Sequence, residues 1–146
     1  MINAVVSTRI DKFYNETEHR DSLDQALVRW LGLINVLAYP IPNSLVANNL
    51  LESWLEHIRP QAIVLSGGHD IGVDEERDLT ELHALTYAKN KGLPLLGICR
   101  GLQSVSHFFG VPTKLVSGHI NKRHDVHGKI FSLYSRTRKF NLFTFC

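Results

Sequence analysis

The sequence predicts an α/β domain in which a parallel sheet is covered by helices on both faces. Short uninterrupted apolar runs alternate along most of the chain with segments of helical periodicity. Strands of a parallel sheet are buried on both faces, so they read as continuous apolar runs. The length of 146 residues suits a single domain with a sizeable core.

The expected strands are the apolar runs, at residues 2–7, 33–39, 62–65, 93–98 and 113–117. Pro40 and Pro42 end the second strand, and a glycine turn over residues 66–72 follows the third.

The expected helices carry apolar residues at helical spacing, at residues 20–31, 44–58, 74–90 and 100–109. The stripe of the first helix is Leu23, Ala26, Leu27, Trp30 and Leu31. Asn43 or Ser44 is the expected cap of the second. Its expected buried face is Ala47, Leu51, Trp54, Leu55 and Ile58. Gly92 and Gly110 are expected to end the third and fourth helices.

The pattern weakens after Ser117, where only residues 129–134 read as a further strand. We therefore expect a domain over residues 1–128, incomplete at its C-terminal part, and a divergent basic tail over 129–146. Residues 114–146 contain seven Lys or Arg and one acidic residue. A basic tail can bind nucleic acid, but a loosely folded segment of different origin explains this charge equally well. No nucleic-acid partner is expected.

The composition is that of a globular protein, with 44% hydrophobic and 21% charged residues. No apolar run approaches the length of a membrane span, and no signal peptide is recognised, so no membrane partner is expected. The two cysteines do not indicate a disulfide framework. We therefore expect a cytoplasmic protein with a free thiol at Cys99.

Cys99 is the main candidate for chemistry, because it is the centre of the segment Gly97-Ile98-Cys99-Arg100-Gly101. This G-x-C-x-G pattern follows an apolar run and opens a helix, as in a nucleophile elbow. Glycines are required there because side chains would clash with the neighbouring strand and helix. A helix N-terminus also favours a thiolate. The alternative is a small buried hydrophobic residue, and the flanking glycines argue against it.

Gly67 and Gly68 follow the third expected strand, at the sheet edge where ligands of α/β proteins bind. Their N–H groups, together with that of Arg100, could stabilise the oxyanion of an acyl-transfer intermediate. An ordinary glycine turn is the alternative.

These blocks resemble class I glutamine amidotransferases, and most closely the gamma-glutamyl-gamma-aminobutyrate hydrolase (peptidase C26-like) branch. The resemblance rests on the order and spacing of residues 64–71, 77–78, 94–103 and 118–124, and covers residues 2–128. It implies a flavodoxin-like fold, a Cys-His-Glu triad, and hydrolysis of a small-molecule γ-glutamyl amide through a thioester at Cys99. It also implies that Gly68 and Arg100 form the oxyanion hole. Gly67, Gln103, His119 and His124 would lie on the substrate side.

The resemblance extends to hydrolases that remove γ-glutamate from a nucleotide-linked glutamine phosphate in surface-polysaccharide modification. The short loop over residues 70–77 favours that alternative substrate slightly. The amine half of the substrate, a homodimer, and a synthase partner that receives ammonia all remain open.

No His-x-Glu pair, the family's source of the general base, follows Cys99 in the sequence. We therefore expect an incomplete copy of the family's domain. His107, His119, His124 and His127 are weak substitutes for the base, since geometry comes first. The last three also have a spacing that could bind zinc, but a solvated cluster is favoured and no metal is expected.

Arg77, Asp78 and Glu81 open the third helix, either as a solvated helix start or as residues near the active site. No phosphate-binding motif is present, so no cofactor is expected. Two other functions stay open: a catalytically dead remnant that binds a partner, and a plain ligand-binding domain.

Overall fold

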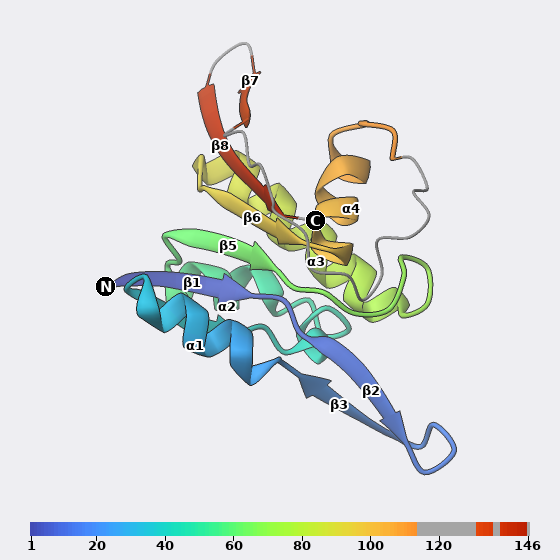
Figure 1. Cartoon of the computed structure of the whole chain (residues 1–146). Coiled ribbons are helices and arrows are strands. Elements are labelled where there is room, and N and C mark those ends of the chain that lie inside the picture. Colours follow the sequence, from blue (N-terminus) through green and yellow to red (C-terminus); the bar gives the residue numbers. More distant parts are fainter. Residues whose placement is uncertain (114–130, 136–137, 146) are drawn as a thin grey trace.

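A six-stranded sheet forms the centre of the molecule. The computed structural model describes residues 1–113, 131–135 and 138–145. The strands are β1 (Ile2–Val6), β4 (Val36–Pro40), β5 (Ala62–Leu65), β6 (Leu95–Ile98), β7 (Phe131–Ser135) and β8 (Arg138–Phe145). Their spatial order is β4-β1-β5-β6-β8-β7 (Figure 1). All neighbouring pairs are parallel except β7 and β8. The flavodoxin-like α/β fold class predicted from the sequence is confirmed.

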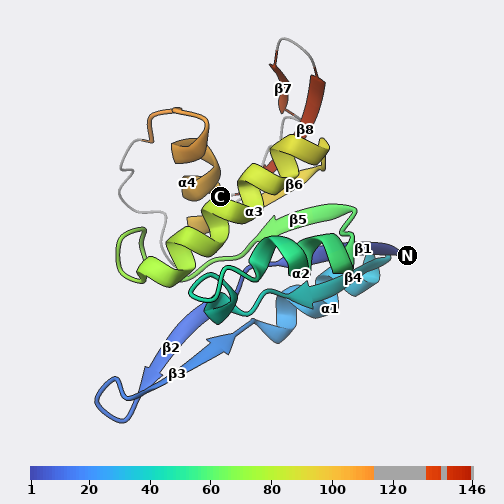
Figure 2. The ribbon, with the colours of Figure 1, turned by 180° about the vertical axis from the view of Figure 1, so that it is seen from behind.

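Helices cover both faces of this sheet. They are α1 (Gln25–Leu33), α2 (Leu51–Ile58), α3 (Glu75–Lys91) and α4 (Arg100–Phe108). Helix α1 packs on one face, and α2 and α3 pack on the other, which Figure 2 shows from behind. Helix α4 follows β6 and contacts β5, β6 and α3. In the described part of the chain, no helix has the length and apolar character needed to cross a membrane.

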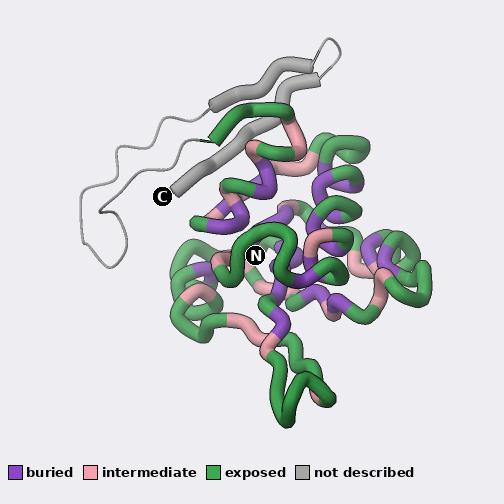
Figure 3. Tube along the Cα trace, turned by 90° about the vertical axis from the view of Figure 1, so that its right-hand side faces the viewer, coloured by how far each residue is buried: buried purple, intermediate pink, exposed green. Residues whose placement is uncertain are grey.

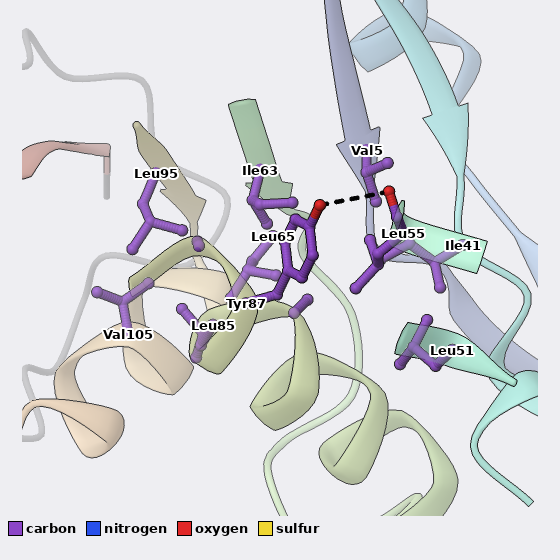
Figure 4. Packing of buried hydrophobic residues seen from close by; sticks show 12 residues of the cluster. Val5, Ile41, Leu51, Leu55, Ile63, Leu65, Leu85, Tyr87, Leu95 and Val105 are labelled. Carbon is purple, nitrogen blue, oxygen red and sulfur yellow. Dashed lines mark hydrogen bonds between the residues drawn. The ribbon is translucent and has the colours of Figure 1, made fainter. Parts of the chain in front are cut away.

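The continuous apolar strands fill two cores because successive side chains point to opposite faces. In β5, Ile63 and Leu65 join the larger core with residues of α2, α3 and α4 (Figure 4). Val64 lies in the smaller core, against Leu31 of α1. Burying one such side chain stabilises the fold by about 1.5–3 kcal/mol. Burial on both faces fixes the positions of β5 and β6 in the sheet. It therefore also fixes where the loops that follow these strands begin.

A hairpin that the sequence did not predict lies between β1 and α1. Its strands β2 (Arg9–Phe13) and β3 (Glu18–Ser22) are antiparallel and extend away from the sheet. Most of its residues are exposed (Figure 3). The expected helix start at residue 20 was wrong, because β2 pairs with that segment. Helix α1 begins instead after Asp24, whose carboxylate accepts a hydrogen bond from the Ala26 N–H at 2.7 Å.

Two further boundaries differ from expectation around β4. Leu33 belongs to α1, and β4 begins only at Val36. The second helix does not begin at residue 43 or 44, since a 3₁₀ helix, η1 (Asn43–Leu45), precedes α2. The Asn43 side chain is buried and donates to the Thr8 hydroxyl at 2.9 Å, so it anchors the end of β1 and caps no helix. Of the expected buried face, Ala47 is exposed.

The ends of the later helices agree with the sequence, whereas the later strands agree only in part. Gly92 ends α3 in the left-handed conformation, and Gly110, with φ of 68°, follows the end of α4. Residues 138–145 form β8 beside β6, although their sequence shows no strand pattern. Thr113 is not in a strand, and the rest of the strand expected at 113–117 lies outside the described residues. The division of the chain at residue 128 stays a prediction.

Candidate active site

Cys99 occupies the single residue between the end of β6 and the start of α4. Its backbone angles are φ 52° and ψ −110°, a combination that non-glycine residues rarely adopt. Such a conformation costs about 1–3 kcal/mol and persists only when its surroundings impose it. The cysteine is exposed. The backbone therefore has the strained strand-to-helix turn of a nucleophile elbow, with its thiol accessible.

The glycines of the elbow have the steric role expected of them. A Cβ on Gly97 would lie 2.8 Å from the backbone nitrogen of Leu102. A Cβ on Gly101 would lie 2.6 Å from the carbonyl carbon of Leu65, the last residue of β5. These contacts are with backbone atoms, so no side-chain rearrangement can relieve them. The elbow can form only with glycine at both positions.

The turn that follows β5 lies beside the elbow. A Cβ built on Gly67 would be in van der Waals contact with the Cβ of Cys99, at 3.8 Å. Gly68 has φ of 147°, and a Cβ there would overlap the Nη1 atom of Arg77. Arg100 is the first residue of α4, so its N–H has no acceptor within the helix. The structure thus brings Gly67, Gly68, Cys99 and Arg100 to one edge of the sheet.

Behind these loops, two arginines and a glutamate are buried together. Arg77 and Glu81 lie on α3 and Arg100 on α4, with exposed fractions of 0%, 1% and 2%. Glu81 accepts from the Arg77 Nε at 3.1 Å, and its other carboxylate oxygen accepts from Arg100 Nη1. Burial lowers the pKa of Arg77, and the charge of Glu81 opposes that shift. The solvated helix start, one of two expectations for these residues, was wrong for Arg77 and Glu81.

Two more polar side chains complete this buried network. Arg100 Nη2 donates to Asp78 on α3, and the Ser104 hydroxyl donates to Glu81 at 2.7 Å. Ser104 was not expected at the site, and Glu81 had two possible roles from the sequence. A signal was present: Arg77 and Glu81 fall on the same α3 face as buried Ala84, Leu85 and Ala88. Charged residues in register with a buried stripe indicate an internal ion pair.

A cavity of about 510 Å³ adjoins the glycine turn. It opens where β1 has β4 on one side and β5 on the other, the topological switch point at which α/β folds bind ligands. Its lining comes from both sides of this point: Arg9, Ser22, Leu23, Asp24, Leu27, Ser66, Gly67, Gly68 and Ile98. The part contributed by the hairpin and the start of α1 was not expected from the sequence.

His69 and Asp74 flank the turn after Gly68. His69 Nδ1 lies 3.2 Å from an Asp74 carboxylate oxygen, and Lys12 of β2 lies 3.1 Å from the other. Burial would raise the pKa of Asp74, but the hydrogen bonds from Lys12 and His69 hold it below its ordinary value. These contacts join the hairpin to the residue that precedes α3.

The remaining expected site residues are not assembled here. Gln103 is exposed on α4, one turn beyond Cys99, where its N–H donates to the Cys99 carbonyl at 3.3 Å. His107 is also exposed on α4. His119, His124 and His127 lie outside the described residues, so their roles stay predictions.

The fold and the elbow together are those of a class I glutamine amidotransferase, and comparison with known families agrees. The family model described as glutamine amidotransferase class-I matches residues 17–143, so the chain belongs to that family. Among curated proteins, a gamma-glutamyl-CDP-amidate hydrolase of Campylobacter jejuni is 35% identical over 80 residues. The matched region is 51% of this chain and 39% of the relative. The chain therefore spans well under half of that relative's length.

Proposed function

We propose that this protein hydrolyses a γ-glutamyl amide, with Cys99 as the nucleophile. The observation that carries the proposal is the accessible Cys99 thiol in a strained elbow, in contact range of the Gly67–Gly68 turn. Membership of the class I glutamine amidotransferase family and the similarity to a gamma-glutamyl-CDP-amidate hydrolase support the same reaction.

In the proposed reaction, the Cys99 thiolate attacks the γ-carbonyl carbon of the substrate. A C–S bond forms, and the carbonyl π electrons move to the oxygen, where the N–H groups of Gly68 and Arg100 would donate. Collapse of this intermediate breaks the C–N bond, and the leaving nitrogen takes a proton. Water then attacks the γ-glutamyl thioester, which breaks the C–S bond and releases glutamate and the Cys99 thiolate. The proton that this water loses balances the one taken by the leaving nitrogen.

We propose that the substrate's two halves lie on different sides of Cys99. Gln103, His119 and His124 would contact the glutamyl half, and Gly67 would contact the substrate between the two halves, since it also lines the cavity described above. The cavity beside the glycine turn would hold the leaving half, since it lies at the switch point and opens next to Gly68. Arg9 on its wall supplies a cation for an anionic leaving half, as in the nucleotide-linked alternative substrate that the relative's name supports.

A reactive free thiol requires a reducing compartment, so we propose a cytoplasmic location. A small-molecule substrate is the proposed partner, and a homodimer or a synthase partner remains to be tested.

The purified chain tests this function directly. We expect glutamate release from γ-glutamyl amides, and we expect Cys99→Ala to abolish it. Cys99→Ala keeps the backbone of the elbow, and Cys146→Ala serves as the matched control for loss of a thiol. Release that survives Cys99→Ala would overturn the proposal.

A second candidate is a binding protein that acylates without repeated turnover. It needs no general base for deacylation, and none is assigned among the residues that the structure describes around Cys99. Under this alternative an electrophilic glutamine analogue labels Cys99, and release of the leaving amine stops at one equivalent per chain while the glutamyl group stays on Cys99 as the thioester. Sustained release excludes it.

A further inference from the structure

The two proposed oxyanion donors lie on loops that a single buried carboxylate connects. Gly68 follows β5 and Arg100 opens α4, and the two loops are held from beneath by side chains that meet at Glu81 of α3. Glu81 need not contact the substrate, because it would affect the reaction by holding these two loops in position.

Arg77 holds the first loop. Its Nη2 atom donates to the carbonyl oxygens of Ser66 and Gly67, each at 3.0 Å. In a planar trans peptide, the carbonyl and the following N–H point in opposite directions. A Gly67 carbonyl directed at Arg77 therefore directs the Gly68 N–H away from it. Arg77 thus sets the orientation of the first proposed donor.

Arg100 holds the second loop. Its backbone N–H is the other proposed donor, and its side chain is anchored to Asp78 and Glu81 on α3. Only 2% of the Arg100 side chain is exposed, so this anchor is shielded from solvent. Rotation of the first turn of α4 would break these ion pairs.

Glu81 joins the two anchors. One of its oxygens pairs with Arg77 and the other with Arg100 and Ser104. Buried charges persist only when they are paired, and removal of one partner leaves the others uncompensated. Resting on the function proposed above, we propose that Glu81 is a positioning residue that sets the spacing of the Gly68 and Arg100 N–H donors at Cys99.

The proposal predicts a selective loss of reactivity in Glu81→Gln, which keeps the shape of the side chain and removes its charge. One reagent is a glutamine analogue with a chloromethyl ketone in place of the side-chain amide. The thiolate adds to its carbonyl, so a C–S bond and an oxyanion form. The sulfur then bonds to the CH₂ carbon as chloride leaves, and the first C–S bond breaks as the carbonyl reforms. The other reagent is iodoacetamide, which the thiolate alkylates with loss of iodide and without an oxyanion.

We expect Glu81→Gln to slow labelling by the chloromethyl ketone about 100-fold, the cost of a displacement of about 1 Å at a reacting centre. Labelling by iodoacetamide is expected to stay near that of the unaltered chain. Leu85→Ala, one turn further along α3, is the matched control because it destabilises the same helix without changing a charge. An equal loss with both reagents, or the same selectivity in Leu85→Ala, would overturn the proposal.

Ser104→Ala provides a milder variant if Glu81→Gln does not fold, a point that circular dichroism decides. It removes one hydrogen bond to the carboxylate, and we expect about a tenfold selective loss, the size of one charged hydrogen bond.

Amide hydrogen exchange tests the connection independently of reactivity. We expect Glu81→Gln to speed hydrogen exchange at the backbone amides of both Gly68 and Arg100. In Leu85→Ala, exchange at these two amides should change no more than exchange at neighbouring amides. Unchanged exchange at Gly68 would refute the positioning role even if Cys99 were unreactive. Failure of Cys99 to react with the glutamine analogue in the unaltered chain would instead refute the proposed function.

Discussion

Cys99 is exposed and has a positive φ. Its exposure makes the thiol available for reaction, whereas its backbone conformation lowers the stability of the fold. The conformation presents the thiol at the edge of the sheet, and the fold must hold it there against an unfavourable backbone energy. A residue that adopts positive φ freely should therefore stabilise the fold while it removes the chemistry.

Cys99→Gly is expected to raise the free energy of unfolding by about 1 kcal/mol, the strain relieved less the added flexibility of the unfolded chain. Cys99→Ala keeps the strained backbone and is the matched control, with a change near zero expected. Urea unfolding followed by circular dichroism measures both. A Cys99→Gly chain no more stable than Cys99→Ala would show that the backbone is not strained.

Gly101 should be intolerant of even one added methyl group. Gly101→Ala would place a Cβ against the carbonyl of Leu65, and we expect it to lower the free energy of unfolding by about 3 kcal/mol. Gly32→Ala is the matched control, because nothing lies within 4 Å of a Cβ at that position of α1. There the methyl group should stabilise the helix by about 0.5–1 kcal/mol. Opposite signs for the two substitutions in urea unfolding would support this view of the elbow.

At the scale of elements, the hairpin β2–β3 is joined to the start of α3 through Asp74. Its carboxylate is 4% exposed and contacts Lys12 of β2 and His69 of the preceding loop. Asp21 of β3 also accepts a hydrogen bond from the Asn43 N–H at 3.0 Å, so the hairpin is held beside the cavity at two junctions.

The junction at Asp74 gives stability a defined dependence on pH. The pKa of Asp74 is lower in the fold than in the unfolded chain. Its contribution is therefore complete above the unfolded value of about 3.9 and is lost as pH falls through the folded pKa. We expect the stability difference between the unaltered chain and Asp74→Asn to be constant near pH 7 and to shrink below about pH 4.

Glu56→Gln is the control for Asp74→Asn, since Glu56 forms an exposed pair with Lys91 and should contribute about 0–1 kcal/mol. Guanidinium unfolding series between acid and neutral pH would measure both differences. A difference for Asp74→Asn that grows on acidification would contradict the assignment.

Elements that depend on residues close together in the sequence were predicted, and elements that depend on distant contacts were not. The elbow and the third helix were predicted correctly because glycine spacing and a left-handed cap at Gly92 act over a few residues. The hairpin was missed because β2 reads Arg-Ile-Asp-Lys-Phe, without the alternation of a half-buried strand. Asn43 was one of two expected helix caps, with Ser44, whereas its burial against Thr8 depends on a contact 35 residues away in sequence.

For a related reason, the sequence indicated only part of the network at Glu81: the spacing on α3 places Arg77 and Glu81 on the buried face, but does not identify Arg100 and Ser104 as their partners. Charged residues at the start of a helix are usually solvated, and only the approach of α4 to α3 buries these. The pairing of Arg77 with Arg100 through one carboxylate is a tertiary property, which no single segment specifies.

At the scale of the whole molecule, the cavity at the switch point is the proposed site of the leaving half, beside the Gly67–Gly68 turn. Arg9 lies on its wall and pairs with Asp11 at 2.6 Å. Arg20 forms a similar exposed pair with Glu18 and does not line this cavity, so it is a matched control.

Arg9→Ala is expected to raise KM for a nucleotide-linked γ-glutamyl substrate about tenfold, the size of one charge-assisted hydrogen bond. Arg20→Ala should leave KM unchanged, and both variants should be labelled normally by a glutamine analogue without a leaving nucleotide. Steady-state kinetics at fixed ionic strength would separate them. Equal effects of the two substitutions would remove the cavity from the binding site.

The contact between Gly101 and Leu65 has a consequence for how this edge of the sheet responds to change. Helix α4 packs against the backbone of Leu65, the last residue of β5, and Gly67 lies two residues later in the chain. Main-chain atoms therefore determine the distance between Cys99 and the glycine turn. Side-chain substitutions do not change the size of these atoms. Substitutions of the surrounding side chains during evolution can alter stability or substrate preference, while the distance between Cys99 and the turn stays the same.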